Sequence, residues 1–337
     1  MTRLCATSAP SRRHIIKGLL TTGLATPAIL RASTAFAAYP ERPVRIIVAN
    51  TPGGPSDIIA RIVAAALQET LGGAVFVENR GGAGGGIGGK FVATSDPDGY
   101  TILITPGGSL TTGPAVHVNI GYDPVKVFTP VGLLIETPLV VAAYQDVPVK
   151  SLAELVAYGK ANPGKLTWGS QGFGTAPHLL AELFKLDAGV NVLHVPYRGT
   201  APLLAAAVAG EIQMLADTLP TIMPHIQSGK LRPLAIAGAE RTPKLPGVPT
   251  IVEVGYPKLQ APFWLGVVAP TGTPAPIIDK LNAAFRDSLA QPITAAQLAN
   301  LGADVKIGTP VEFGKMLAKE LALWTAVVKA ANITKVE

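Results

Sequence analysis

The sequence has little cysteine and little charge. Among its 337 residues there is one cysteine, Cys5, and only 15% of the residues are Asp, Glu, Lys or Arg. A single cysteine near the start of the chain excludes a disulfide framework and a cysteine-based metal site. The fold must therefore be held together by a hydrophobic core, and a chain of this length can build two domains.

The sequence motifs of common enzymes are also missing. There is no H-E-x-x-H, C-x-x-C or G-x-S-x-G motif. Four histidines follow residue 37 without metal-ligand spacing: His117, His178, His194 and His225. We therefore expect no catalytic residue and no metal site, and each histidine is interpreted as a surface or helix-end group.

The first 37 residues have the composition of an export signal. Arg12 and Arg13 lead a basic segment, an apolar run covers residues 18–30, and Ala35 and Ala37 form a small-x-small cleavage site. The apolar run is shorter than the roughly 20 residues needed to span a bilayer. The paired arginines resemble a twin-arginine signal, and the general secretory route stays open as an alternative. We expect cleavage after Ala37.

Removing this segment changes the charge of the chain. The segment holds five basic residues and no acid, so Lys plus Arg falls from 28 to 23 against 22 Asp plus Glu. The formal net charge accordingly falls from +6 to +1. We therefore expect no nucleic-acid partner and no binding to an anionic membrane.

Apolar β-branched runs alternate with helical patterns along the rest of the chain. This alternation predicts an α/β fold with right-handed β-α-β crossovers and mainly parallel sheets. A second unit of the same kind is complete between about residues 150 and 239. The strand at 263–269 and the helices at 275–290 and 310–331 are expected to pack back on the first unit.

Three loops that are rich in glycine and hydroxyl side chains follow predicted strands, at 51–57, 106–112 and 170–175. The carboxyl ends of parallel strands lie at one edge of a sheet, so two facing domains would aim these loops into one cleft. In the first loop we expect Ser56 to cap the next helix, whose free N–H groups favour an anion. A plain strand-to-helix turn is the alternative.

The three loops together offer hydrogen-bond donors but no nucleophile and no general base. This combination indicates a binding protein and not a catalyst.

Three other features allow two interpretations each. The glycine run from Gly81 to Gly89 contains G-x-G-x-x-G, but Phe91 stands where a P-loop needs a hydroxyl, so a turn for close helix packing is favoured over nucleotide binding. Asp217 ends a predicted strand, either as a ligand contact or as a structural acceptor. Arg198 either pairs with a carboxylate or stays solvated.

Several residue runs along the chain together resemble a known family. They include YPERPVR at 39–45, PGGPSD at 52–57, VENR at 77–80, DPDGYT at 96–101, YRGTAP at 197–202, APTGTP at 269–274, and Glu320 with Trp324. In these runs the chain resembles the tripartite tricarboxylate transporter substrate-binding proteins of the bacterial periplasm, also called Bug receptors. The resemblance covers nearly all of the chain after the export signal.

The resemblance implies a two-domain fold of the type II periplasmic-binding-protein kind that closes over a small organic acid. Domain 1 would comprise residues 38–142 and 262–337, domain 2 residues 143–261, and the two crossing segments would be the hinge. One loop from each domain would hold a ligand carboxylate. The candidate ligand-binding residues are Pro52, Gly53, Gly54, Pro55, Ser56, Asp57, Ser109, Ser170, Gly172, Gly174, Thr175, Tyr197 and Asp217. Trp168 and Phe173 make the second loop aromatic, which favours an aromatic or bulkier acid.

The implied function is that of a periplasmic receptor, expected to be a monomer, that delivers a carboxylate to integral-membrane transporter subunits. Two alternatives remain. One is a ligand-sensing receptor that contacts a membrane sensor without transport. The other is an exported enzyme with a nucleotide-type cofactor on the run from Gly81 to Gly89. For the receptor we expect no cofactor.

Overall fold

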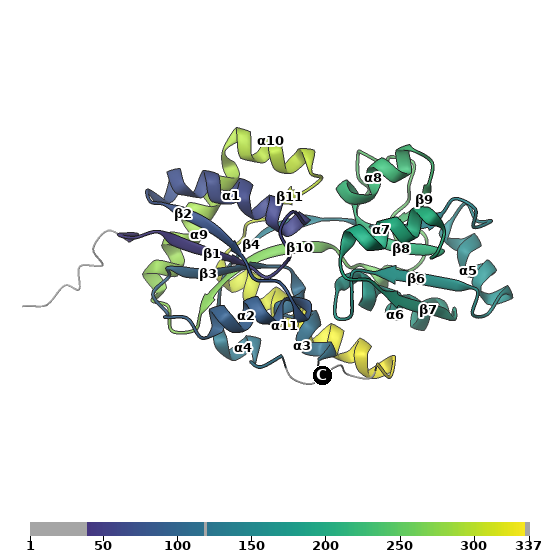
Figure 1. The fold of residues 1–337 in the computed structure, drawn as a ribbon, viewed down its shortest axis with the longest axis horizontal. Coiled ribbons are helices and arrows are strands. Elements are labelled where there is room, and N and C mark those ends of the chain that lie inside the picture. The colour runs from purple at the N-terminus through teal and green to yellow at the C-terminus, as the bar shows by residue number, and fades with distance from the viewer. Residues whose placement is uncertain (1–38, 118–119, 334–337) are drawn as a thin grey trace, which may run out of the picture. The chain divides into compact units, whose positions relative to one another are not determined.

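The computed structural model describes residues 39–117 and 120–333, so the expected export signal and its cleavage site lie outside the described residues. Residues 38–337 form one compact unit. Strands and helices alternate along this unit and build two separate sheets with helices around them (Figure 1). The predicted α/β fold with two sheets is confirmed.

The first sheet has six strands and is mixed. Its order is β11 (Asp304–Val305), β4 (Phe128–Thr137), β10 (Phe263–Pro270), β3 (Thr101–Thr105), β1 (Val44–Val48) and β2 (Val75–Asn79). β1 pairs in parallel with both β2 and β3, as the alternation predicted. β10 returns from far along the chain and pairs antiparallel with β3 and β4. The C-terminal part therefore completes the first sheet, as expected.

The second sheet has five strands. Its order is β7 (Val192–Pro196), β6 (Leu166–Ser170), β8 (Met214–Thr218), β5 (Leu139–Tyr144) and β9 (Leu231–Ile236). β6 pairs in parallel with β7 and β8, whereas β5 pairs antiparallel with β8 and β9. The expected domain boundary between residues 142 and 143 falls inside β5, which belongs to the second sheet from Leu139 onward.

Helices cover both faces of each sheet. They are α1 (Pro55–Leu71), α2 (Gly86–Ala93), α3 (Thr112–Val116), α4 (Pro124–Val127), α5 (Leu152–Ala161), α6 (Ala176–Ala188), α7 (Thr200–Ala209), α8 (Leu219–Gln227), α9 (Ala275–Ala290), α10 (Pro292–Asn300) and α11 (Pro310–Ala330), with short 3₁₀ turns η1 (Ala83–Gly85), η2 (Gly107–Ser109) and η3 (Pro257–Leu259). None of those helices is long and apolar enough to cross a bilayer.

Alternation along the strands divides each sheet's side chains between two cores. In β1, Ile46 packs with α1 and α9, whereas Ile47 packs with α2 and Phe313 of α11. In β5, Val141 packs with α5 and α6, and Val140 packs with α7 and α8. Such two-sided burial explains why these strands read as continuous apolar runs.

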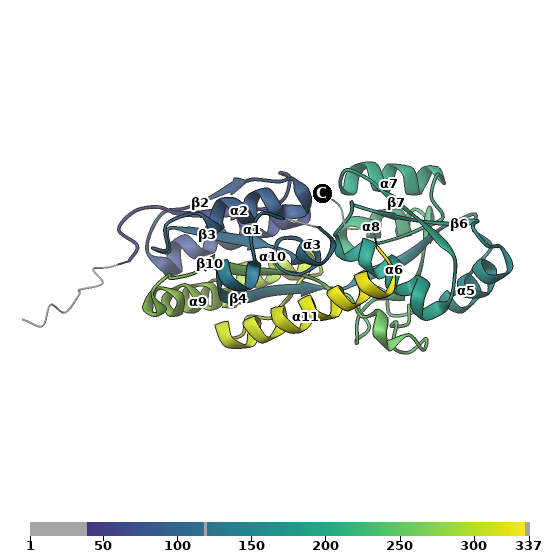
Figure 2. The same ribbon diagram turned by 90° about the horizontal axis from the view of Figure 1, so that it is seen from below.

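The long helix α11 takes part in the cores of both sheets. Phe313 near its start lies in a core of the first sheet, and Trp324 near its end lies in a core of the second, each at most 2% exposed. Figure 2 shows the helix running from β4 to α6. A capping box begins this helix, because Thr309 and Glu312 exchange both hydrogen bonds. At Ser151, the N-cap of α5, only half of such a box forms, since Glu154 accepts from Lys150 N–H instead.

Candidate functional site

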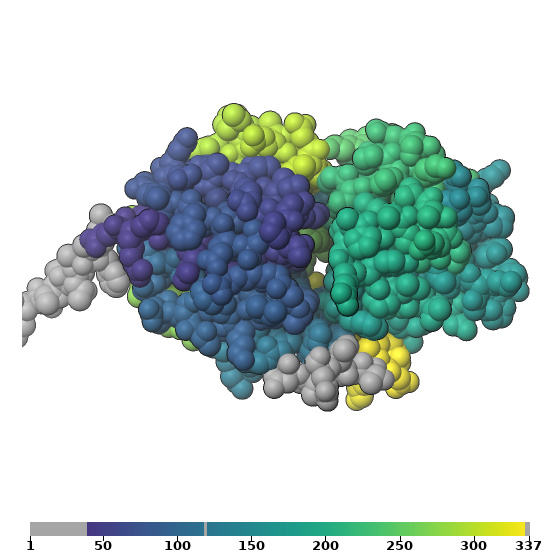
Figure 3. All heavy atoms as spheres, in the orientation of Figure 1, coloured from purple at the N-terminus to yellow at the C-terminus, as the bar shows by residue number. Residues whose placement is uncertain are grey.

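A cavity of about 560 Å³ lies where loops from both sheets meet. The space-filling view shows a hollow between the blue first-sheet surface and the green second-sheet surface (Figure 3). The first-sheet side contributes residues 49–51, 54–56, 82–85, 106–108, Thr112, Trp264 and Glu320, and the second-sheet side contributes Leu139, 171–173, 175–177, 198–200, Asp217 and Thr218. Residues 262 and 263 belong to the segment that returns to the first sheet.

The loop after β1 is built differently from the expectation. Gly54, not Ser56, is the N-cap of α1, and no side chain caps this helix. The expected role of Ser56 was therefore wrong, because Pro55 occupies the first helical turn and moves the cap one residue before it. Asp57 Oδ2 accepts a hydrogen bond from Gly53 N–H at 2.8 Å, and this bond holds the loop in place on the side away from the cavity. Gly54, Pro55 and Ser56 are left facing the cavity.

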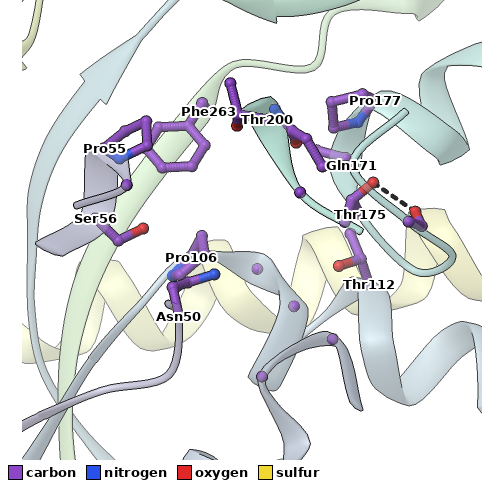
Figure 4. A pocket seen from close by; sticks show the side chains of 18 of the residues that line it. Asn50, Pro55, Ser56, Pro106, Thr112, Gln171, Thr175, Pro177, Thr200 and Phe263 are labelled. Carbon is purple, nitrogen blue, oxygen red and sulfur yellow. Dashed lines mark hydrogen bonds between the residues drawn. The ribbon is translucent and has the colours of Figure 1, made fainter. Parts of the chain in front are cut away.

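The loop after β6 is fixed by polar contacts behind it. Ser170 Oγ lies 2.6 Å from His194 Nε2, and Gly174 N–H donates to His178 Nδ1 at 3.2 Å. Thr175, the N-cap residue of α6, donates its hydroxyl to Gly172 O at 2.8 Å (Figure 4). Because this hydroxyl turns back to the loop, it does not cap the helix.

Five helices begin at N-cap residues that line the cavity, and none of them has a side-chain cap. They are α1, α2, α6, α7 and α8, with N-caps Gly54, Gly85, Thr175, Gly199 and Thr218. Of the remaining helices, α4, α5 and α11 are capped by side chains, whereas α3, α9 and α10 are not. First-turn N–H groups and the positive ends of helix dipoles therefore converge on the cavity, and this arrangement favours an anion.

Polar side chains add further hydrogen-bonding groups to the lining. The buried atoms Asn50 Oδ1 and Thr112 Oγ1 have no partner within the described part of the chain, and both residues line the cavity in Figure 4. Buried polar atoms without partners are costly, so such atoms at a cavity are available to a ligand or to water. Arg198 is the only cationic side chain among the described residues that line the cavity.

Two acidic side chains also line the cavity, and both are held by donors. Burial raises the pKa of Asp217, although hydrogen bonds from Thr218, Thr221 and Gln171 act against it. Burial likewise raises the pKa of Glu320, against hydrogen bonds from two indole N–H groups and one threonine hydroxyl. Burial therefore makes each carboxyl group easier to protonate than an exposed one, whereas the hydrogen bonds that it accepts stabilise its ionised form.

The predicted site residues fall into two groups. Those that line the cavity are Gly54, Pro55, Ser56, Gly172, Thr175 and Asp217. Those that lie behind or beside the lining are Pro52, Gly53, Asp57, Ser109, Ser170, Gly174 and Tyr197. Ser109 donates to Gly85 O at 2.8 Å and so supports a lining loop. Tyr197 packs against a core of the second sheet.

Sequence reasoning missed several lining residues. The glycine run was interpreted as a packing turn, and a Cβ added at Gly88 would indeed come within 3.0 Å of Ala49, but residues 82–85 of the same run line the cavity. The available signal was that this run, like the three predicted loops, follows a strand. Trp168 was expected to shape the site, but it is 1% exposed and packs on Phe184 in the core. Phe173 and Phe263 are the aromatic side chains beside Trp264 that do line it.

The two histidines behind the second loop give a prediction about pH. Burial, with His194 and Lys185 nearby, lowers the pKa of His178 to about 3, and burial with Lys185 lowers that of His194 to about 4. An unfolded histidine takes up a proton near pH 6.5, whereas these remain neutral in the fold. The contribution of these two histidines to the free energy of unfolding is therefore fully present above pH 6.5. It falls as the pH drops towards 4, by about 1.4 kcal/mol per pH unit for His178.

Urea unfolding at pH 7, 6 and 5 measures this dependence. His178→Asn is the control variant, because an amide oxygen can accept from Gly174 N–H without titrating. Its free energy of unfolding should fall less steeply with pH than that of the wild type. Equal slopes in the two proteins would contradict the prediction, because they would mean that His178 takes up its proton as readily in the folded as in the unfolded protein.

Comparisons with known proteins agree with this geometry. The model of a family described as tripartite tricarboxylate transporter family receptor matches residues 59–333. Protein BugT of Bordetella pertussis is 36% identical over 312 residues, which cover 92% of this chain and 94% of BugT. The solved structure of the periplasmic binding protein BugD is 37% identical, with a TM-score of 0.78, and covers 88% of this chain and 99% of BugD. A structure from R. palustris with adipate is 36% identical, with a TM-score of 0.80 and coverages of 87% and 98%.

Proposed function

The chain belongs to the tripartite tricarboxylate transporter receptor family, and on this premise we propose that it is a periplasmic receptor that captures a small organic carboxylate in the cavity between its two sheets. It then delivers the ligand to integral-membrane transporter subunits. That the protein is a receptor and not an enzyme is part of the same proposal. Two similar structures support this proposal: BugD is described as a periplasmic binding protein, and the R. palustris structure contains adipate.

One observation carries the proposal more than any other. Five helices begin, without a side-chain cap, at N-cap residues that line a single cavity. A carboxylate accepts hydrogen bonds from several N–H groups at once and gains from each positive helix end. No histidine, cysteine or lysine is among the described residues that line the cavity, and Ser170, which is hydrogen-bonded to His194, lies behind the lining. The lining therefore offers no nucleophile with a histidine base for acyl transfer.

We further propose that binding involves the residues predicted from the sequence, with different tasks. Gly54, Ser56, Gly172 and Thr175 contact the ligand, whereas Asp57, Ser109, Ser170 and Gly174 hold the contacting loops in place. The domains would divide at Pro138 and Pro262, where the chain passes between the sheets. Export through residues 1–37, with cleavage after Ala37, and a monomeric receptor complete the proposal.

Titration calorimetry of the purified mature chain against linear mono- and dicarboxylates from acetate to adipate tests the proposal. We expect at least one member of this panel to bind with a dissociation constant in or below the micromolar range, and acids capped as methyl esters not to bind. A folded protein that binds none of the carboxylates would contradict the proposed function.

Arg198 gives a second test of the same site. It lies before α7, lines the cavity and forms no ion pair within the described ranges. Its guanidinium is therefore free to pair with a ligand carboxylate. Arg198→Ala should weaken carboxylate binding by roughly tenfold, the size of a charge-assisted hydrogen bond, and lower its salt dependence. Arg286→Ala, on α9 outside the cavity, is the matched control and should bind as the wild type does.

A further inference from the structure

Gln171 is the long polar side chain at the second-sheet side of the cavity. It follows β6 directly and lines the cavity together with Thr175 and Thr200 (Figure 4). A glutamine amide ends in one acceptor oxygen and one donor nitrogen, so its effect on a ligand depends on which of the two faces the cavity. The partner of this amide within the protein decides that question.

The partner is Asp217, at the end of the neighbouring strand β8. Its carboxyl group is fully buried and lies under Gln171. Thr218 N–H donates to Oδ1 at 2.6 Å, and Gln171 Nε2 donates to Oδ2 at 2.8 Å. A carboxylate only accepts hydrogen bonds, so it binds the amide nitrogen of Gln171 and not the oxygen.

With its nitrogen held by Asp217, the amide is left with its oxygen unpaired. Gln171 Oε1 forms no hydrogen bond with any residue that the structure describes. We infer that Asp217 orients Gln171 so that this oxygen accepts a hydrogen bond from the ligand, and that the site therefore selects carboxylates that also carry a hydroxyl, ammonium or amide N–H group. The inference rests on the proposed function and names the class of ligand.

The lining holds two further side-chain oxygens without a partner in the described part of the chain, Asn50 Oδ1 and Thr112 Oγ1, both on the first-sheet side. Gln171 Oε1 is the corresponding acceptor on the second-sheet side, where Arg198 and first-turn N–H groups donate to a carboxylate. A ligand without a donor would leave Gln171 Oε1 desolvated and unpaired, and a second carboxylate there would place acceptor against acceptor. Sites built around a polar partner discriminate strongly against analogues that lack it.

Calorimetry with matched ligands tests the inference. The ligands are butanoate, its 2- and 3-hydroxy forms, and the matching oxo acids 2-oxobutanoate and 3-oxobutanoate, which carry only an acceptor where the hydroxy acids carry a donor. In the wild type we expect at least one hydroxy acid to bind about tenfold more tightly than both butanoate and the corresponding oxo acid.

Asp217→Asn should change this preference while keeping the shape of the side chain. The new amide nitrogen can donate to Gln171 Oε1, which turns the Gln171 amide and presents its nitrogen to the cavity. The preference for the hydroxy acid over the oxo acid should then disappear or reverse. If Asp217 only supported the fold, its substitution would weaken the binding of the hydroxy acid and of the oxo acid by the same factor. Asp279→Asn, an exposed aspartate on α9, is the matched control and should keep the wild-type ratio.

Gln171→Leu provides the second variant, in case Asp217→Asn does not fold. It removes the amide, so binding of butanoate should persist while the gain from the hydroxyl is lost. If carboxylates bind but the ratio of hydroxy to oxo acid is the same in the wild type and both variants, the inference is wrong and the proposed function stands. If no ligand binds the folded wild type, the proposed function itself fails.

Discussion

Replacing Gly54 by tryptophan should abolish carboxylate binding and leave the fold intact. Gly54 caps α1 with φ of −79°, a value open to any residue, and an added Cβ would come no closer than 3.5 Å to its nearest neighbour, Thr51 O. The backbone therefore tolerates a side chain. The indole, however, would occupy the cavity in front of the first-turn N–H groups of α1. We expect the dissociation constant to rise about 100-fold or more, which equals about 2.7 kcal/mol.

The measurement is calorimetric titration, with circular dichroism and thermal unfolding to show that the fold is kept. Gly247→Trp is the matched control, because Gly247 is exposed, lies outside the cavity and has open space around its Cα. This variant should bind as tightly as the wild type. Wild-type affinity in a folded Gly54→Trp protein would show that ligands bind elsewhere.

Replacing Trp324 by alanine should cause the largest loss of stability. Trp324 is 1% exposed in a core of the second sheet, and its indole N–H donates to Glu320 Oε1 at 3.1 Å. The change leaves a large void and removes one partner of a buried carboxyl group. Truncation of a buried tryptophan costs about 3–5 kcal/mol. Urea unfolding followed by circular dichroism should show a loss of that size.

Two variants of the same helix separate the causes. Trp324→Phe keeps most of the ring volume and loses the N–H group, so it should cost only about 1–2 kcal/mol. Leu323→Ala changes a neighbouring side chain that is 43% exposed, and should cost about 0.5 kcal/mol or less. If Trp324→Ala were no less stable than Leu323→Ala, α11 would not be anchored in the core of the second sheet.

Much of the fold could be predicted because burial leaves a pattern in the sequence. The strand expected at 263–269 is observed as β10 (Phe263–Pro270), within one residue of its predicted bounds, because its apolar run is buried along its length. The direction of β10 could not be predicted, because the period-two pattern of a strand is the same in both directions. For the same reason nothing in β5 indicated that it joins the second sheet and not the first. Strand partners depend on contacts between distant parts of the chain.

The parts of the candidate site that could be predicted are those in which the signal lies in a few neighbouring residues of the sequence. The loops before α1 and α6 were found because glycine and hydroxyl residues follow apolar runs. Ser56 was chosen as the cap by residue type, although Pro55 carried the better signal. The turn at residues 82–85 was set aside because it could not hold a phosphate, but a poor phosphate loop can still line a carboxylate cavity. Arg198 and Glu320 reach the cavity through the tertiary fold alone.

A cavity lined largely by backbone has a consequence for how such receptors change over evolution. Glycines at positions 54, 82, 84, 85, 107, 108, 172 and 199 line it, and a backbone N–H group is chemically the same whatever residue follows. Mutations that keep these glycines therefore leave the hold on the carboxylate untouched, and ligand choice depends on a few lining side chains such as Gln171, Arg198 and Phe263. Duplicated copies of such a gene could acquire new ligands by single substitutions while the capture of the acid group is inherited unchanged.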